Sequence, residues 1–146
     1  MLKNSGHGYN IPNPLLDIHK QILVDDERYY AQHMLVDTRR CNHRITSIPD
    51  VTSFIKKLVV LIDMEGWEEP MVTRFPEDKS IGSLQGVSAI QMLYTSRSIT
   101  LHGHDNTRDM YLDIFSCKEY DTKKVESFVK EFFEPVVYKS QSILRK

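Results

Sequence analysis

The chain has 146 residues, with 19 Lys and Arg against 20 Asp and Glu and a formal net charge of −1. This length predicts one domain with a single core, and a chain that is 40% hydrophobic and 27% charged is typical of ordinary globular proteins. Because the basic residues are scattered and the charge is balanced, the electrostatic pattern of a nucleic-acid or anionic-membrane binder is missing. We therefore expect neither nucleic acid nor a membrane as a partner.

The two cysteines, Cys41 and Cys117, lie far apart in a chain without a secretory leader pattern. No apolar run approaches the roughly 20 residues of a membrane-spanning helix. We expect a cytoplasmic protein, in whose reducing surroundings a free thiol is the commoner state. Spacing alone leaves a disulfide between these cysteines open.

Residues 1–28 begin with turn-forming Gly, Asn and Pro and predict an N-terminal extension, so the domain is expected over residues 29–146. Residues 29–38 are rich in aromatic and branched side chains and predict a strand, and residues 42–47 predict a loop.

The first predicted helix begins after Ser47, which forms a capping pair with Asp50 three residues on. We expect this helix to end at Gly66. Its apolar residues recur at helical spacing and are Val51, Phe54, Ile55, Leu58, Val59 and Ile62.

Four strands are predicted next, over residues 70–75, 87–94, 98–102 and 110–117. The polar loop 76–86 contains Gly and Ser beside Lys79, but it lacks the order G-x-x-x-x-G-K-[ST] of a phosphate-binding loop, so a plain loop is favoured.

Asp121 is the expected cap of a second helix, which ends at Glu134-Pro135 and is followed by a last strand over residues 136–144. Its apolar stripe is Val125, Phe128, Val129, Phe132 and Phe133. The order β-α-β-β-β-β-α-β predicts an α/β (α+β) two-layer sandwich, in which two helices cover one face of an antiparallel sheet.

Strand alternation assigns the polar side chains to one face of that sheet. Ile99 and Leu101 must join the core, which places Ser98, Thr100 and His102 on the opposite face. By the same alternation Asp113 and Cys117 share this face, and Ser88 and Ser96 share a face with each other. We expect Ser88, His102 and Cys117 to surround one pocket.

Four segments carry a resemblance to a known family: Gly86-Val87-Ser88, Thr95-Ser96, Ser98 to His102, and Asp113 to Cys117. They resemble the pattern of the small S-adenosylmethionine decarboxylases, which runs G-V-S, then E-S eight positions on, then H-x-S-I-H-T-W-P-E, then D-x-F-T-C. Arg74-Phe75 is similar to the H-R-F of the same family, which implies a place for Phe75 at the pocket rim.

The resemblance implies a proenzyme that cuts itself between Thr95 and Ser96 and converts Ser96 into a pyruvoyl group. Such a group forms a Schiff base with the substrate amine and accepts electrons as carbon dioxide leaves. In the family pattern Ser88 and His102 assist cleavage, and Cys117 is the general acid that reprotonates the α-carbon. The implied role is in spermidine and polyamine biosynthesis, and the implied assembly is a homodimer with sites near the subunit contact.

The sequence departs from the family at two places. One residue is extra between Ser96 and His102, which shifts the two relative to each other unless a bulge absorbs it. The W-P-E is replaced by His104-Asp105-Asn106, where His104 is expected to stack on a base and Asp105 or Asn106 to donate or accept hydrogen bonds.

Two alternatives remain open from these departures. In the first, the substrate is another amine such as arginine or ornithine. In the second, the chain is an unprocessed relative that binds S-adenosylmethionine or a partner subunit without catalysis. His102 and His104 also suggest a metal ligand pair, but no further pair has recognisable ligand spacing, so we expect no metal.

Overall fold

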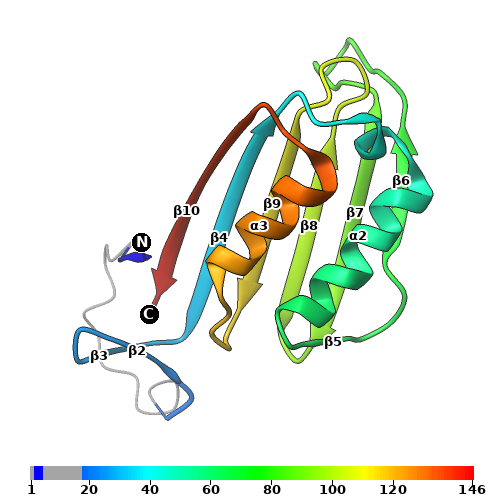
Figure 1. The fold of residues 1–146 in the computed structure, drawn as a ribbon. Helices are drawn as coiled ribbons and strands as arrows, with labels where there is room; N and C mark the ends of the chain where they lie inside the picture. The colour runs from blue at the N-terminus through cyan, green and yellow to red at the C-terminus, as the bar shows by residue number, and fades with distance from the viewer. Residues whose placement is uncertain (1, 5–17) are drawn as a thin grey trace.

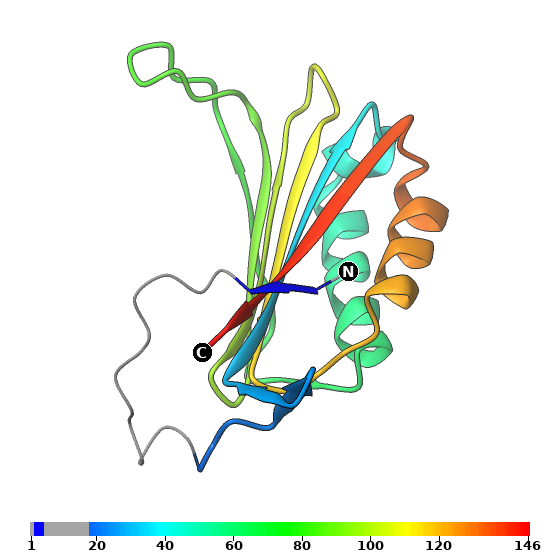
Figure 2. The same ribbon diagram turned by 90° about the vertical axis from the view of Figure 1, so that its left-hand side faces the viewer.

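The computed structural model describes residues 2–4 and 18–146. Within them one eight-stranded sheet carries two α-helices on a single face, as Figures 1 and 2 show. The predicted two-layer α/β fold and its order of elements are confirmed. The sheet contains β1 (Leu2–Asn4), β4 (Ala31–Arg39), β5 (Glu65–Gly66), β6 (Met71–Phe75), β7 (Gly86–Tyr94), β8 (Arg97–Gly103), β9 (Met110–Ser116) and β10 (Val137–Arg145).

The strands follow the order β1-β10-β4-β9-β8-β7-β5, and β6 also pairs with β7. All these pairs are antiparallel except that of β1 with β10. A separate hairpin of β2 (Ile22–Val24) and β3 (Glu27–Tyr29) buries Ile22 and Tyr29 with Leu144 of β10. Since most of the predicted extension over residues 1–28 lies outside the described residues, that boundary stays a prediction.

The first helix, α2 (Ile48–Leu61), follows the short 3-10 helix η1 (His43–Thr46) and has the predicted Ser47 cap, whose Oγ accepts from the Asp50 amide at 3.2 Å. It does not continue to Gly66 as expected. Asp63 takes a left-handed backbone conformation with φ of 58°, and the Met64 amide donates to Val59 at 3.1 Å, which closes the last turn. Gly66 instead pairs with β7.

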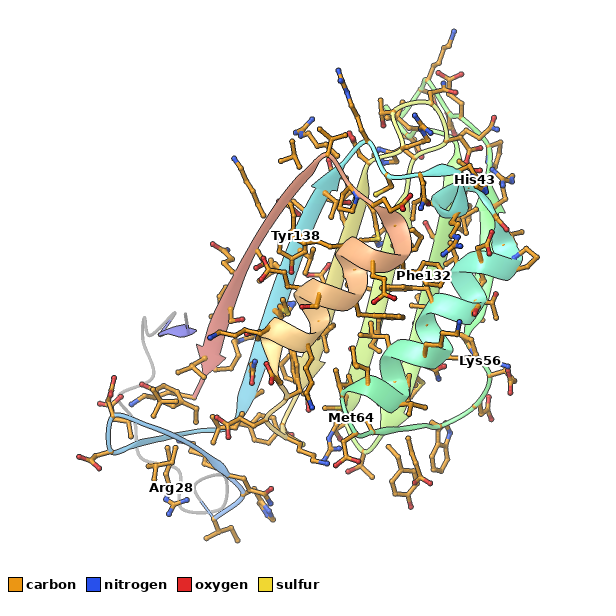
Figure 3. The ribbon with its side chains drawn as sticks, in the orientation of Figure 1. Arg28, His43, Lys56, Met64, Phe132 and Tyr138 are labelled. Carbon is orange, nitrogen blue, oxygen red and sulfur yellow. The ribbon has the colours of Figure 1, made fainter. Side chains whose placement is uncertain are left out.

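The second helix, α3 (Thr122–Phe133), is capped by Asp121 as predicted, and Glu134 with φ of 47° ends it before Pro135. Phe132 lies between α3 and α2 in Figure 3, in contact with Phe54 of α2. Phe54 also stacks on Phe128 with the ring centroids 5.0 Å apart. This aromatic cluster joins the two helices above the sheet.

The face of the sheet away from the helices is uncovered in the described part of the chain, and we call it the open face. Alternation along β7 to β9 follows the prediction: Ile99, Leu101, Leu112 and Ile114 are buried under the helices. The residues between them therefore project from the open face.

Candidate active site

Ser88 of β7 and His102 of β8 form the first polar pair on the open face. They are direct partners in the β7–β8 ladder, and Ser88 Oγ lies 3.0 Å from His102 Nδ1. Their neighbours Val87 and Leu101 are fully buried, which fixes the direction of both side chains. A hydroxyl and an imidazole at this distance can exchange a proton.

Gly86 lets the two strands approach closely beside this pair. A Cβ added at Gly86 would lie 1.8 Å from the carbonyl oxygen of Gly103 on β8. Only glycine avoids that collision, which gives the Gly of the Gly86-Val87-Ser88 motif a physical reason.

A cavity of about 540 Å³ adjoins Ser88 and His102. The loop between β6 and β7 contributes Ser83 and Leu84 to it, and Figure 2 shows this loop bending away from the helices at the top left. The apolar part of the lining comes mainly from alternate residues of β6 and β7 and from this loop: Met71, Phe75, Leu84 and Ile90. Phe75 lines this cavity, and its part in binding a substrate stays a prediction.

Ser96 lies at the tip of the β7–β8 hairpin, at the other end of these strands. Its side chain is exposed and its φ is 56°. The Cys117 thiol donates to the Thr95 carbonyl at 3.9 Å, and Arg97 Nε donates to Cys117 Sγ at 3.4 Å. The bond predicted to break is therefore next to the predicted general acid.

The two groups of residues do not surround one pocket within a single chain. His102 pairs with Tyr111, and Cys117 lies six residues further along the chain from Tyr111. At roughly 3.3 Å per strand residue, Cys117 is about 20 Å from His102. The expectation of one pocket is thus wrong for one chain, because sharing a face does not bring together residues at opposite ends of a strand.

The extra residue of this chain is absorbed at the hairpin tip. Leu93 pairs with Arg97, so Tyr94, Thr95 and Ser96 form a three-residue connection, and Ser88 remains opposite His102. A left-handed residue at the third position is usual in such connections, and Ser96 occupies it. With this three-residue turn, Ser88 stands directly opposite His102.

The three residues that replace W-P-E have different surroundings. His104 lines the cavity beside Ser88, and its Nδ1 is buried without a hydrogen-bond partner in the described structure. Asp105 instead binds Arg74, and it accepts from Gln85 Nε2 at 2.9 Å. Asn106 lies outside this cavity, on a second hollow.

Sequence reasoning missed two parts of the site. The contact of Arg97 with Cys117 depends on the three-residue turn, which the sequence pattern did not predict. Met71 and Thr73 line the cavity with Phe75, and their alternation along residues 71–75 was the available signal.

Both cysteines are free. Cys41 is 1% exposed, and burial raises the pKa of its thiol, partly offset by a contact of 3.2 Å with Thr38 Oγ1. Across residues 2–4 and 18–146, no group of three His, Cys, Asp or Glu side chains gathers as a metal site requires. Over the same residues no helix has the length and apolarity needed to span a membrane.

The fold and the open face define a class: a two-layer α/β domain with a Ser-His pair at one end of the β7–β8 hairpin and Cys117 against the turn at its other end. The family model described as S-adenosylmethionine decarboxylase matches residues 32–146, so the chain belongs to that family. Family members are decarboxylases, and the family is in general pyruvoyl-dependent.

A crystal structure of the adenosylmethionine decarboxylase from Aquifex aeolicus VF5 has a similar fold, with a TM-score of 0.66. The alignment covers 80% of this chain and 91% of that one at 13% identity. No curated protein sequence matches this chain significantly.

Proposed function

We propose that this protein is a pyruvoyl-dependent decarboxylase that cuts itself between Thr95 and Ser96 and acts on S-adenosylmethionine. The observation that carries the proposal is the Cys117 thiol, 3.9 Å from the Thr95 carbonyl, beside an exposed Ser96. The thiol is thereby held at the bond that must break and at the residue that must become the reactive group.

The chemistry of cleavage uses only the chain itself. Ser96 Oγ attacks the Thr95 carbonyl carbon, and the peptide C–N bond breaks as the C–O ester bond forms. Loss of the Ser96 α-proton then expels the Thr95 carboxylate and leaves a dehydroalanine. The dehydroalanine, an enamine with a free NH2, tautomerises to the imine as its Cβ gains a proton. Water hydrolyses this imine and releases ammonia, so residue 96 ends as a pyruvoyl group. The chain becomes two.

The residues present fit such a group. A pyruvoyl group at residue 96 supplies an electron-accepting carbonyl for the amine substrate. Cys117 holds a proton at Sγ next to that position, and Arg97 orients the sulfur through its Nε donor. The Ser88–His102 pair supplies a proton acceptor for the attacking hydroxyl.

Completing the site requires a second copy of the chain. Because the Ser88–His102 pair lies about 20 Å from Cys117 in one chain, it cannot assist cleavage at Ser96 of the same chain. A two-fold axis that runs across the strands and parallel to the sheet would place the Ser88–His102 end of one chain against the Ser96–Cys117 end of the other. Such an interface makes two identical composite sites.

The open face has the composition that such a homodimer needs. Exposed apolar side chains gather on β6 and β7 of this face, with one more on β9, and a patch of this kind usually marks an interface. These residues are Met71, Phe75, Ile90, Met92, Tyr94 and Tyr111.

The cavity beside Ser88 is the proposed binding place for the body of the substrate. Phe75 is 53% exposed, so its ring is available to stack on a purine. His104 offers a second ring and the unpartnered Nδ1. These two residues replace the aromatic surface that the missing W-P-E would have supplied.

Mass spectrometry of the purified protein tests the proposal. We expect a 51-residue fragment that begins at residue 96 and has a blocked amino end. Borohydride with substrate should label it, and Ser96→Ala should abolish both cleavage and carbon dioxide release. Ser98→Ala, on the same hairpin, is the matched control and should be cleaved. A wild-type chain that stays whole while folded would overturn the assignment.

A further inference from the structure

A second hollow, of about 580 Å³, lies at the end of the sheet where β4 leaves it and β8 turns into β9. It is separate from the cavity beside Ser88, and no residue lines both. Two short segments form it. One is at the end of β4 and contains Arg39 and Arg40; the other lies in the loop after β8 and contains Asn106, Thr107, Arg108 and Asp109.

The hollow has an excess of positive charge. Arg39 Nη1 lies 3.8 Å from Asp109 Oδ2, and the Asp109 side chain is only 13% exposed, so that carboxylate is largely covered. Among the described residues, neither Arg40 nor Arg108 forms a salt bridge or a side-chain hydrogen bond. Two exposed guanidinium groups with unused donors therefore remain.

Backbone hydrogen bonds join the two segments that carry these arginines. The Cys41 amide donates to the Arg108 carbonyl at 2.9 Å, which ties the two segments to each other. The Arg108 amide donates to His104 at 2.8 Å, and the Val136 amide donates to Arg39 at 3.0 Å. The backbone beneath the three guanidinium groups is thereby fixed, and a bound anion would relieve the repulsion between them.

We propose that this hollow binds the phosphate groups of a small phosphorylated molecule. The planar guanidinium fork matches two oxygens of a phosphate at once, and charge-assisted bonds of this kind are the strongest hydrogen bonds available to a side chain. The Thr107 hydroxyl and the exposed Asn106 amide add uncharged partners on the same wall. Two free guanidinium groups and the size of the hollow favour a pyrophosphate unit over a single phosphate.

The site shares a loop with the proposed active site. Residues 104–109 present His104 to the cavity beside Ser88 and Asn106 to Asp109 to the phosphate hollow. The His104 amide donates to Asp109 at 3.0 Å, which closes the loop. Binding at the hollow does not depend on processing or decarboxylation, so its test is independent of the proposed function.

Isothermal titration of the whole protein with pyrophosphate at low ionic strength tests the site, with potassium chloride as the reference titration. Arg40→Gln and Arg108→Gln should each weaken binding about tenfold, and the double variant should abolish it. Arg28→Gln, an exposed arginine on β3, is the matched control and should bind as the wild type does. Ser96→Ala should also bind normally, whether or not the wild type is processed.

Two results would overturn the proposal. One is a wild type that does not bind pyrophosphate at millimolar concentration, and the other is a double variant that binds as tightly as the wild type. Titration with ATP separates phosphate recognition from base recognition, since ATP binding without pyrophosphate binding also contradicts the site. Arg40 makes no contact that the fold depends on, so Arg40→Gln remains decisive even where Arg108→Gln lowers stability.

Discussion

Complementation between two inactive variants tests the composite site most directly. His102→Ala retains Ser96 but removes the group that assists its cleavage, and Ser96→Ala retains His102 but removes the scissile serine. The strand register separates these positions by about 20 Å within a chain, so in the proposed dimer His102 acts on the Ser96 of its partner. Each variant alone should stay whole.

The expected magnitude follows from the two-fold arrangement. A heterodimer of the two variants contains one intact site, in which the Ser88–His102 pair of the Ser96→Ala chain faces the Ser96 of the His102→Ala chain. Random mixing of equal amounts gives heterodimers in about half of all dimers, so about half of the His102→Ala chains should be cleaved. Purification of the heterodimer through two different tags should raise this fraction to nearly all.

Co-expression followed by mass spectrometry measures the cleaved fraction without knowledge of the substrate. Ser88→Ala mixed with His102→Ala is the control, because both lesions then affect the same half of the site and no intact site forms. A tag-purified heterodimer of Ser96→Ala and His102→Ala that remains whole would refute the shared site. Equal cleavage in the control pair would refute it as well.

The remaining predictions concern stability and thiol reactivity. Gly86→Ala should lower the free energy of unfolding in urea by about 3 kcal/mol, because the Cβ of the new alanine would lie 1.8 Å from the Gly103 carbonyl oxygen. A loss under about 1 kcal/mol would contradict that contact. Phe54→Ala should cost about 3 to 5 kcal/mol in the same assay, since Phe54 is fully buried between the helices. Iodoacetamide at pH 8 should modify Cys117 of the folded protein and spare Cys41. Burial covers the Cys41 thiol and also raises its pKa, which lowers the fraction present as thiolate. Equal labelling of the two cysteines would show that this part of the core opens.

The helices and strands themselves could be predicted from the sequence, because each depends on contacts between residues that are close in sequence. The Asp121 cap and the phenylalanine stripe predicted α3 to within a residue, and alternation along residues 98–102 and 110–117 predicted which side chains leave the core. The end of α2 was not predictable in this way. Asp63 there adopts a left-handed conformation that the pattern assigned to Gly66, and Asp is a much weaker sequence signal for that conformation than Gly.

The family could also be predicted, since the residue types and spacing of its pattern survive in Ser88, Ser96, His102 and Cys117, whose chemical roles stay proposals. Their arrangement in space was decided only by the tertiary structure. Alternation determines the face of a sheet, but the distance along a strand depends on the register, and the register depends on the length of the hairpin turn. The sequence therefore predicted one constellation, whereas in the folded chain the Ser88–His102 pair and Cys117 lie at opposite ends of the strands, and a second copy joins them in the proposed dimer.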